Sequence, residues 1–318
     1  SPTSTGLSSC DKLGLISDSF ASGRAGYSSI VDSLGLIQDF GTHEVAEHSI
    51  ILWQEVSKNL GYLVYLYRSE HFFSRFKRFI KRIFSKQMTN LGWDAKPTDS
   101  GRTGALRKVV ISMLSLVGDE NVLTEGLRRF RNFYRFGQQI PGDLRMVVFR
   151  AALWANEEQV YPALKRIYEK SNVPEEQRDC LSVLGAVENK GRHAEMCEYV
   201  FFSGKVQPQN IAYSLSALSS TMDAGGRACW DYFRESFPRV SAKFEDTHLW
   251  GTCVGLSCRG LRSHQEADEV ESFFRNLPQR AGSAERRLSQ TLEAIRTAAA
   301  RATRDRGPVA QYLNSLNI

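Results

Sequence analysis

The sequence predicts an all-α protein in which short helices follow one another as a solenoid of the HEAT or armadillo kind. Apolar residues recur at three- and four-residue steps over almost all of the 318 residues, and alternating runs typical of strands are nearly absent. Helix–turn–helix units of irregular length, roughly 30 to 45 residues each, fit such an array, although no strict repeat is present. Packing each helix pair on the next would curve the array and give it a concave side.

Length and composition bound the domain organisation. A chain of this size with 42% hydrophobic residues can bury a substantial core, and it is long for one globule but ordinary for a helical array. No long Gly/Ser/Pro-rich stretch marks a linker, so one elongated domain and two tightly packed halves both remain open. We expect a disordered polar lead over residues 1–9 and a single helical domain over residues 10–318.

The ends and the apolar runs of the sequence indicate a soluble piece of a longer protein. There is no initiating Met, no signal segment, and no apolar run near the roughly 20 residues that span a membrane. We therefore predict no membrane partner.

Six cysteines are scattered without CxxC pairs, and Cys180, Cys197 and Cys229 each lie inside an apolar helical pattern. They are Cys10, Cys180, Cys197, Cys229, Cys253 and Cys258. Buried free thiols in a reducing compartment are the favoured interpretation, which predicts a cytoplasmic protein.

The charge of the chain is a weak indicator of partners. The net charge is +6 and the pI about 9.0, but 41 basic and 35 acidic residues are mixed along most of the sequence. We predict no nucleic-acid partner, since a modest basic excess is only a weak indicator of nucleic-acid binding.

The first strongly marked helix covers residues 71–86, HFFSRFKRFIKRIFSK. Its apolar stripe consists of Phe72, Phe76, Phe79, Ile80 and Ile83. Its remaining positions include Arg75, Lys77, Arg78, Lys81, Arg82 and Lys86. We favour a solenoid helix with a buried apolar stripe and a solvated basic stripe. Binding to an anionic membrane or a calmodulin-like groove is the alternative, and acidic partners or peptide C-termini also remain open for the basic residues.

The second helix is predicted over residues 174–187. Pro174 suits the first helical position, and Glu175 and Glu176 suit the positive N-terminal end of a helix. Its stripe consists of Cys180, Leu181, Leu184 and Val187. Gly191 then marks the turn into a helix that carries Met196, Tyr199 and Val200.

The third helix is predicted over residues 263–277. Ser263 and Glu266 have the spacing of a capping box. Ala267, Val270, Phe273, Phe274 and Leu277 then lie along one face, which must be buried against a neighbouring helix.

Motifs for catalysis and metal binding are absent from the sequence. No phosphate-binding glycine loop, Gly-x-Ser-x-Gly elbow or HExxH helix occurs. The nearest approach to HExxH is HEVAEH, in which His43 and Glu44 are followed by Glu47 and His48. Five residues turn a helix by roughly 500°, so the two imidazoles would point about 140° apart and could not share a metal. We interpret this string as a polar helix start.

The other histidines and the tryptophans carry no site prediction. His71, His193, His248 and His264 lie in polar or cap-like surroundings and are expected at the surface. The tryptophans, spread singly through apolar helices, are expected in the core: Trp53, Trp93, Trp154, Trp230 and Trp250.

Several sequence blocks, in order and spacing, resemble one peptidase family over nearly the whole chain from about Cys10. The blocks are residues 15–29, 91–97 (LGWDAKP), 140–153 (IPGDLRMVVFRAAL), 174–186, 206–220 (VQPQNIAYSLSALSS), 225–237 (GGRACWDYFRESF), 266–278, 282–296 and 311–313. They resemble the C-terminal helical domain of the zinc aminopeptidases of the puromycin-sensitive and endoplasmic-reticulum type, most closely the puromycin-sensitive branch. The resemblance implies a bowl of antiparallel helix pairs, in which Gly225 and Gly226 form a turn before the packing residue Trp230.

The resemblance also implies where the chemistry lies. The family's HExxH and GxMEN motifs are both missing here, so we predict no catalytic, cofactor-binding or metal-binding residue in this chain, and the implied zinc belongs to an absent catalytic domain. The implied partners are that catalytic domain, on the same polypeptide, and peptide substrates. In the family this domain covers the active site and controls peptide access, length selection and domain closure.

The chain departs from the family pattern at three places. Arg301-Ala302 stands where a Trp-Leu pair is common, Ser236-Phe237 replaces Asn-Trp, and Gln207 and Asn210 replace the charged residues of VRxQD. The first two changes put local packing in question, and the third removes charges that could contact other domains. The alternative functions are a free-standing HEAT-like interaction scaffold and, third, a basic nucleic-acid binder.

Overall fold

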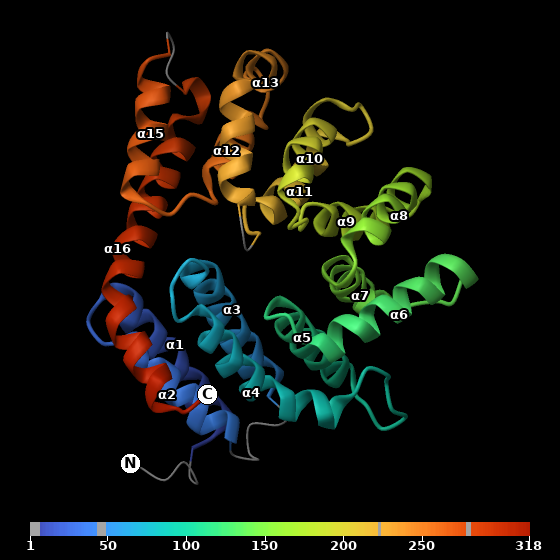
Figure 1. The fold of residues 1–318 in the computed structure, drawn as a ribbon, viewed down its shortest axis with the longest axis vertical. Coiled ribbons are helices and arrows are strands. Elements are labelled where there is room, and N and C mark those ends of the chain that lie inside the picture. The colour runs from blue at the N-terminus through green and yellow to red at the C-terminus, as the bar shows by residue number, and fades with distance from the viewer. Residues whose placement is uncertain (1–6, 43–48, 222–223, 278–280) are drawn as a thin grey trace. The chain divides into compact units, whose positions relative to one another are not determined.

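The computed structural model describes residues 7–42, 49–221, 224–277 and 281–318, and all regular structure in these ranges is helical (Figure 1). Within them the chain forms 16 α-helices and two 3-10 helices of three residues each, with no strand. The all-α prediction is therefore confirmed. HEVAEH at residues 43–48 lies outside the described residues.

The helices divide into two units. The first comprises Ser1–Leu123, Pro141–Val147 and Arg301–Ile318, and the second comprises Thr124–Ile140 and Val148–Ala300. The prediction of a single domain over residues 10–318 stays a prediction, as does the concave bowl.

The first unit contains five complete helices. They are α1 (Ser9–Ala25), α2 (Ile30–Thr42), α3 (Ile50–Tyr67), α4 (Phe73–Leu91) and α5 (Gly101–Leu116). Parts of α6 (Glu120–Phe136), α7 (Gly142–Ala155) and the long α16 (Glu285–Ser315) belong to it as well. Here α1 packs on α2 and α3, and α5 packs on both α3 and α4. Its core is aromatic, because Tyr67 makes edge-on contacts with Phe72 and Phe76 at ring-centroid distances of 5.3 and 5.4 Å.

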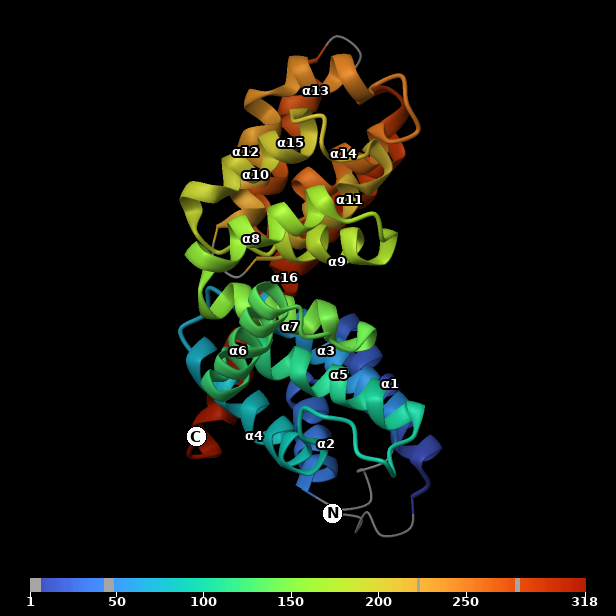
Figure 2. The ribbon, with the colours of Figure 1, turned by 90° about the vertical axis from the view of Figure 1, so that its right-hand side faces the viewer.

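The second unit continues the succession of helices. Its complete helices are α8 (Glu157–Lys170), α9 (Pro174–Leu184), α10 (Lys190–Phe202), α11 (Ile211–Leu218), α12 (Gly225–Glu235), α13 (Phe237–Phe244), α14 (Trp250–Cys258) and α15 (His264–Arg275). Figure 2 shows α8 beside α9 and α10 beside α12, pairs that are also in contact. In both units neighbours in sequence pack on each other, which is how helical solenoids bury their cores.

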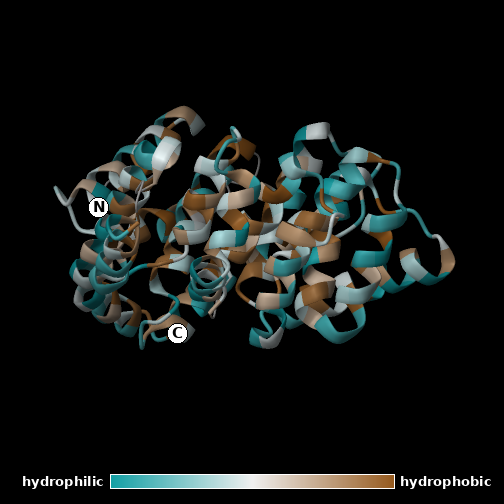
Figure 3. Ribbon diagram, turned by 90° about the horizontal axis from the view of Figure 1, so that it is seen from above, coloured by the Kyte–Doolittle hydropathy of each residue, from teal (hydrophilic) through white to brown (hydrophobic). Residues whose placement is uncertain are grey.

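The predicted starts of two helices are confirmed, but α9 ends at Leu184 and α15 at Arg275, before the predicted Val187 and Leu277, and Gly191 lies inside α10 rather than in a turn. Pro174 is the first residue of α9, and α15 begins after Ser263 with the capping box to Glu266 formed. Helices such as α4, α6 and α12 are amphipathic, and Figure 3 shows hydrophobic and hydrophilic residues within single helices. On α4 the buried side consists of Phe76, Phe79, Ile80, Ile83, Phe84 and Gln87.

Three of the five tryptophans lie in the core as predicted. Trp53, Trp230 and Trp250 are at most 3% exposed, while Trp93 and Trp154 are half-buried. Five cysteines are buried free thiols, and Cys10 is exposed. None of the helices in the described ranges has the length and apolar character needed to cross a bilayer.

Candidate functional site

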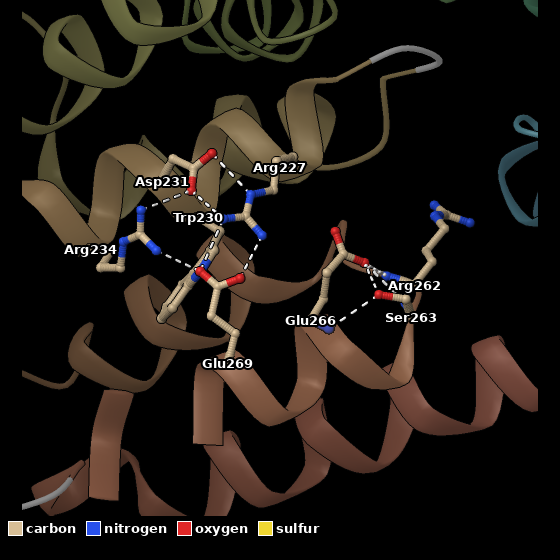
Figure 4. Close-up of polar contacts among 8 residues, drawn as sticks. All are labelled: Arg227, Trp230, Asp231, Arg234, Arg262, Ser263, Glu266 and Glu269. Carbon is tan, nitrogen blue, oxygen red and sulfur yellow. Dashed lines mark hydrogen bonds and ion pairs between the residues drawn. The ribbon is translucent and has the colours of Figure 1, made fainter. Parts of the chain in front are cut away.

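A side-chain network of charged groups in the second unit joins α12 to α15 around Glu269 (Figure 4). Arg227, Asp231 and Arg234 are spaced four and three residues apart, so α12 presents them on one side. Figure 4 shows both arginines pointing toward Glu269, with Asp231 between them and Trp230 on the same helix.

The carboxylate of Glu269 is surrounded by donors. It accepts hydrogen bonds from Arg227 Nη1 and Nη2 at 2.7 and 3.0 Å, from Trp230 Nε1 at 3.0 Å, and from Arg234 Nη1 at 2.6 Å. Asp231 in turn accepts two hydrogen bonds from Arg227, at 2.8 and 3.0 Å. These donors occupy both carboxylate oxygens of Glu269, and the network ties α12 to α15 through charge-assisted bonds.

The electrostatics of this network oppose a role in proton transfer. The hydrogen bond from Arg227 lowers the pKa of Glu269 despite partial burial, with smaller contributions from Trp230 and Arg234. Hydrogen bonds to Glu269 and Asp231 raise the pKa of Arg227. A general acid or base near neutral pH needs a pKa shifted toward neutrality and a free site for the proton. Glu269 has neither, so the network is structural.

Another carboxylate of α15, that of Glu266, caps the N-terminus of its own helix. Glu266 accepts hydrogen bonds from the backbone N–H groups of Arg262 and Ser263 at 2.9 and 3.0 Å, and its own N–H donates to Ser263 Oγ at 3.1 Å. This carboxylate closes the capping box that starts the helix.

Two glycines bring α12 into contact with the chain that follows α14. A Cβ atom added to Gly226 would lie 2.6 Å from the Cα of Gly260, closer than such atoms approach in proteins. Gly226 is the second residue of α12 rather than part of a turn before it. The pair sets the close approach of α12 to the chain after α14, and Gly260 carries no local motif that would have predicted this role.

A buried polar centre in the first unit contains the residue that departs from the family pattern. Arg301 and Asp305 are 5% and 3% exposed, and Arg301 Nε lies 3.4 Å from Asp305 Oδ2. Tyr67 donates a hydrogen bond of 2.8 Å to the same oxygen, and Arg304 Nε lies 3.1 Å from Oδ1. The guanidinium of Arg301 also lies 5.0 Å from the ring centroid of Tyr62. Burial, and then the charge of Asp305, raises the pKa of Tyr67. A charged cluster therefore packs where the family pattern has a Trp-Leu pair.

A second of the three departures from the family pattern, Ser236-Phe237, is also accommodated. Phe237 makes ring contacts with Phe233, Trp250, Phe273 and Phe274 at centroid distances of 5.2 to 6.2 Å. An aromatic cluster thus persists without the usual tryptophan.

The basic helix α4 is a packing helix. Its apolar side lies in the core, whereas Arg75, Arg78, Arg82 and Lys86 are exposed. This confirms the interpretation of a buried apolar stripe and a solvated basic stripe. The alternative of insertion into a membrane or a calmodulin-like groove is wrong for the folded chain, because the apolar stripe is not available.

The histidines outside residues 43–48 form no metal centre. His71, His248 and His264 are exposed as expected. The surface prediction for His193 is wrong: it is 1% exposed, and its Nε2 lies 3.1 Å from the backbone oxygen of Val187. Among the described residues no group of three His, Cys, Asp or Glu side chains could hold a metal ion.

The absence of a catalytic residue from this chain stays a prediction. The networks that the chain forms escaped prediction because their partners are distant in sequence: Arg227 and Glu269 are 42 residues apart, and Tyr67 and Asp305 are 238 apart. The local signals were the four-residue spacings of Arg227 and Asp231 on α12 and of Arg301 and Asp305 on α16.

The family model and the relatives that match this chain all indicate the same family of proteins. The family model described as "ERAP1-like C-terminal domain" matches residues 2–297. Aminopeptidase 2, mitochondrial, of Saccharomyces cerevisiae is 23% identical over 311 residues, which cover 96% of this chain and 32% of that protein. Aminopeptidase M1 of Arabidopsis thaliana is 25% identical over 302 residues, 92% of this chain and 33% of that protein. Puromycin-sensitive aminopeptidase of Caenorhabditis elegans is 22% identical over 316 residues, 97% and 33% respectively. The chain thus spans about a third of the length of these relatives.

Proposed function

The chain belongs to the ERAP1-like C-terminal domain family, and from this we propose that it is the C-terminal helical domain of a zinc aminopeptidase that removes N-terminal residues from peptides. The observation that carries the proposal is the match over residues 2–297, together with coverage of only about a third of aminopeptidase relatives. The catalytic domain of the same polypeptide and peptide substrates are the proposed partners. We place the protein in the cytoplasm, because buried free thiols suit a reducing compartment.

The domain's contribution is to cover the active site, admit peptides, select their length and take part in closure. A helical solenoid suits this role, since it offers a long surface to an extended peptide. Enclosure of a substrate excludes water and commits it to reaction. Zinc would act in the catalytic domain, because the described residues of this chain do not group the ligands that it needs.

The test compares the longer polypeptide with a version that lacks residues 10–318. Turnover is measured on a single aminoacyl amide and on a peptide of about ten residues, with the zinc content of both proteins as the control for an intact catalytic domain. We expect removal to change the peptide-to-amide ratio of kcat/KM by about tenfold or more, since only the long substrate extends beyond the catalytic centre. An unchanged ratio at equal zinc content would contradict the proposed role.

The isolated chain is expected to hydrolyse nothing. Purified chain is incubated with aminoacyl amide substrates in the presence of added zinc. Turnover that follows the chain through purification would refute this expectation.

A further inference from the structure

The exposed side of α4 is the most strongly charged helix surface in the first unit. Within Phe73–Leu91 six side chains are cationic and none is acidic. The basic face, as we name it, consists of the exposed residues Arg75, Arg78, Arg82 and Lys86.

Lys81 and Lys77, the less exposed cations of α4, also contact other groups of the chain. Lys81 donates to the backbone oxygen of Gly118 at 3.0 Å and lies 4.0 Å from Asp119, and Lys77 lies over the ring of Phe73 at 5.4 Å. On the basic face Arg78 donates one hydrogen bond, 3.1 Å long, to the backbone oxygen of Ile318.

The helices packed against α4 supply little opposing charge. α5, which packs along α4, has no acidic residue. α2 carries Asp32 and Asp39, and α3 carries Glu55, whose carboxylate bonds to Asn59 and Lys58 on its own helix. α4 therefore carries more cations than these three helices carry acidic residues.

The dimensions of the basic face indicate the size of its partner. Arg75 and Lys86 are eleven residues apart, which corresponds to about 16 Å along a helix. A single small anion cannot bridge that length, whereas about five residues of an extended chain do. Three of the four groups are guanidinium groups, whose forked donors suit carboxylates in two-bonded geometry.

The composition of the face disfavours the other polyanions. No large hydrophobic side chain of α4 is exposed, so nothing on this helix would anchor it in a bilayer. The face also lacks the exposed aromatic residues on which single-stranded nucleic acids stack.

We propose that the basic face of α4 binds a carboxylate-rich polypeptide segment supplied by the part of the longer polypeptide that lies outside this chain. The covalent source of the segment rests on the proposed function. Exposed ion pairs are individually weak, and attachment to the same polypeptide compensates by raising the effective concentration of the partner.

The first test measures binding of a fluorescein-labelled octaglutamate peptide by anisotropy at low salt. The variant R75E/R78E/R82E removes three guanidinium groups from the face. Its control, R102E/K205E/R286E, makes the same change in net charge at exposed positions elsewhere. We expect about tenfold weaker binding for the first variant and less than about twofold for the control. Circular dichroism confirms that both variants are folded.

The outcomes separate the sources of affinity. Equal losses in both variants would show that only net charge matters and would overturn the proposal, as would undetectable binding of the peptide. Tighter binding of a single-stranded octanucleotide, or of phosphatidylserine vesicles, would assign the face to nucleic acid or to membrane instead. This titration uses no enzymatic activity, so it can succeed even where the proposed function fails.

The second test uses carbodiimide, which joins lysines to carboxylates in contact, on the longer polypeptide. Cross-links from Lys86 to Asp or Glu residues outside this chain are expected, and R75E/R78E/R82E should reduce them. If the peptide binds but Lys86 forms no such cross-link, the tethered source is refuted.

Discussion

Replacement of Asp305 by alanine should be among the most damaging single substitutions in the first unit. Asp305 is 3% exposed and is the carboxylate partner of Arg301, which is 5% exposed. It also accepts the hydroxyl hydrogen bond of Tyr67 at 2.8 Å. The substitution leaves a buried guanidinium without its counter-ion and a buried phenol without its acceptor.

The expected magnitude follows from these losses. Removing one partner of a buried ion pair costs about 3–5 kcal/mol of the free energy of unfolding. Arg301 retains its contact with the ring of Tyr62, 5.0 Å from the centroid, so the lower end of that range is expected. Tyr67→Phe, which removes one hydrogen bond to an ionised acceptor, should cost about 2 kcal/mol.

A double replacement separates the charge effect from lost packing. In R301M/D305L neither buried charge remains, and Arg304 can turn toward water because its side chain is 41% exposed. Apolar replacement of a whole buried pair is often neutral or stabilising, so most of the loss should be recovered. Free energies of unfolding are measured by urea denaturation followed by circular dichroism. A loss below about 1 kcal/mol for Asp305→Ala, or a double variant no more stable than the single one, would refute this reasoning.

The same centre predicts sensitivity to alkaline pH. Burial and the charge of Asp305 raise the pKa of Tyr67, so the fold favours its neutral form. The resulting stabilisation is fully present below the unfolded pKa of about 10 and is lost as the pH rises above that value. Tyr67→Phe should therefore destabilise the chain less at pH 11 than at pH 8.

Three further predictions concern the second unit and the thiols. Gly226→Ala should lower the free energy of unfolding by about 1–3 kcal/mol, because the added Cβ would lie 2.6 Å from the Cα of Gly260. Gly61→Ala, in open space, should raise the free energy of unfolding by about 0.5–1 kcal/mol. Equal effects of the two substitutions in urea denaturation would contradict the close approach. Glu269→Gln should lower the free energy of unfolding by about 1 kcal/mol at pH 7. Because the pKa of Glu269 is lowered in the fold, this difference should shrink as the pH falls below about 4.5. A pH-independent difference would argue against the ion pairs. Cys10 is the one exposed cysteine, so Ellman's reagent should label one thiol quickly in the native chain and six after denaturation. Rapid labelling of several thiols in the native chain would show that the other cysteines are not buried.

Local chemistry is the part of this fold that the sequence predicts well. The capping box of α15 and the first-turn proline of α9 each depend on residues within four positions, and both form as expected. The buried stripe of α4 follows from helical periodicity in the same way.

Contacts between distant residues could not be predicted in this way. The bond between Arg227 and Glu269 spans two helices and the chain between them, and no pattern in either helix names the other. His193 was misplaced because its sequence neighbours are polar, whereas its ring is buried against the backbone oxygen of Val187. Asp305 is only four residues from Arg301, but Tyr67, which completes this buried centre, is 238 residues from Asp305 in sequence.

The central claim is that this chain is one domain of a larger aminopeptidase, and the size of its native product tests it most directly. An antibody raised against the chain is used to blot and immunopurify the protein from its source cells. The chain covers 32% to 35% of its yeast relatives, so we predict a band about three times larger than 35.9 kDa that co-purifies with zinc-dependent aminopeptidase activity. A band near 35.9 kDa without that activity would contradict the claim and favour a free-standing scaffold.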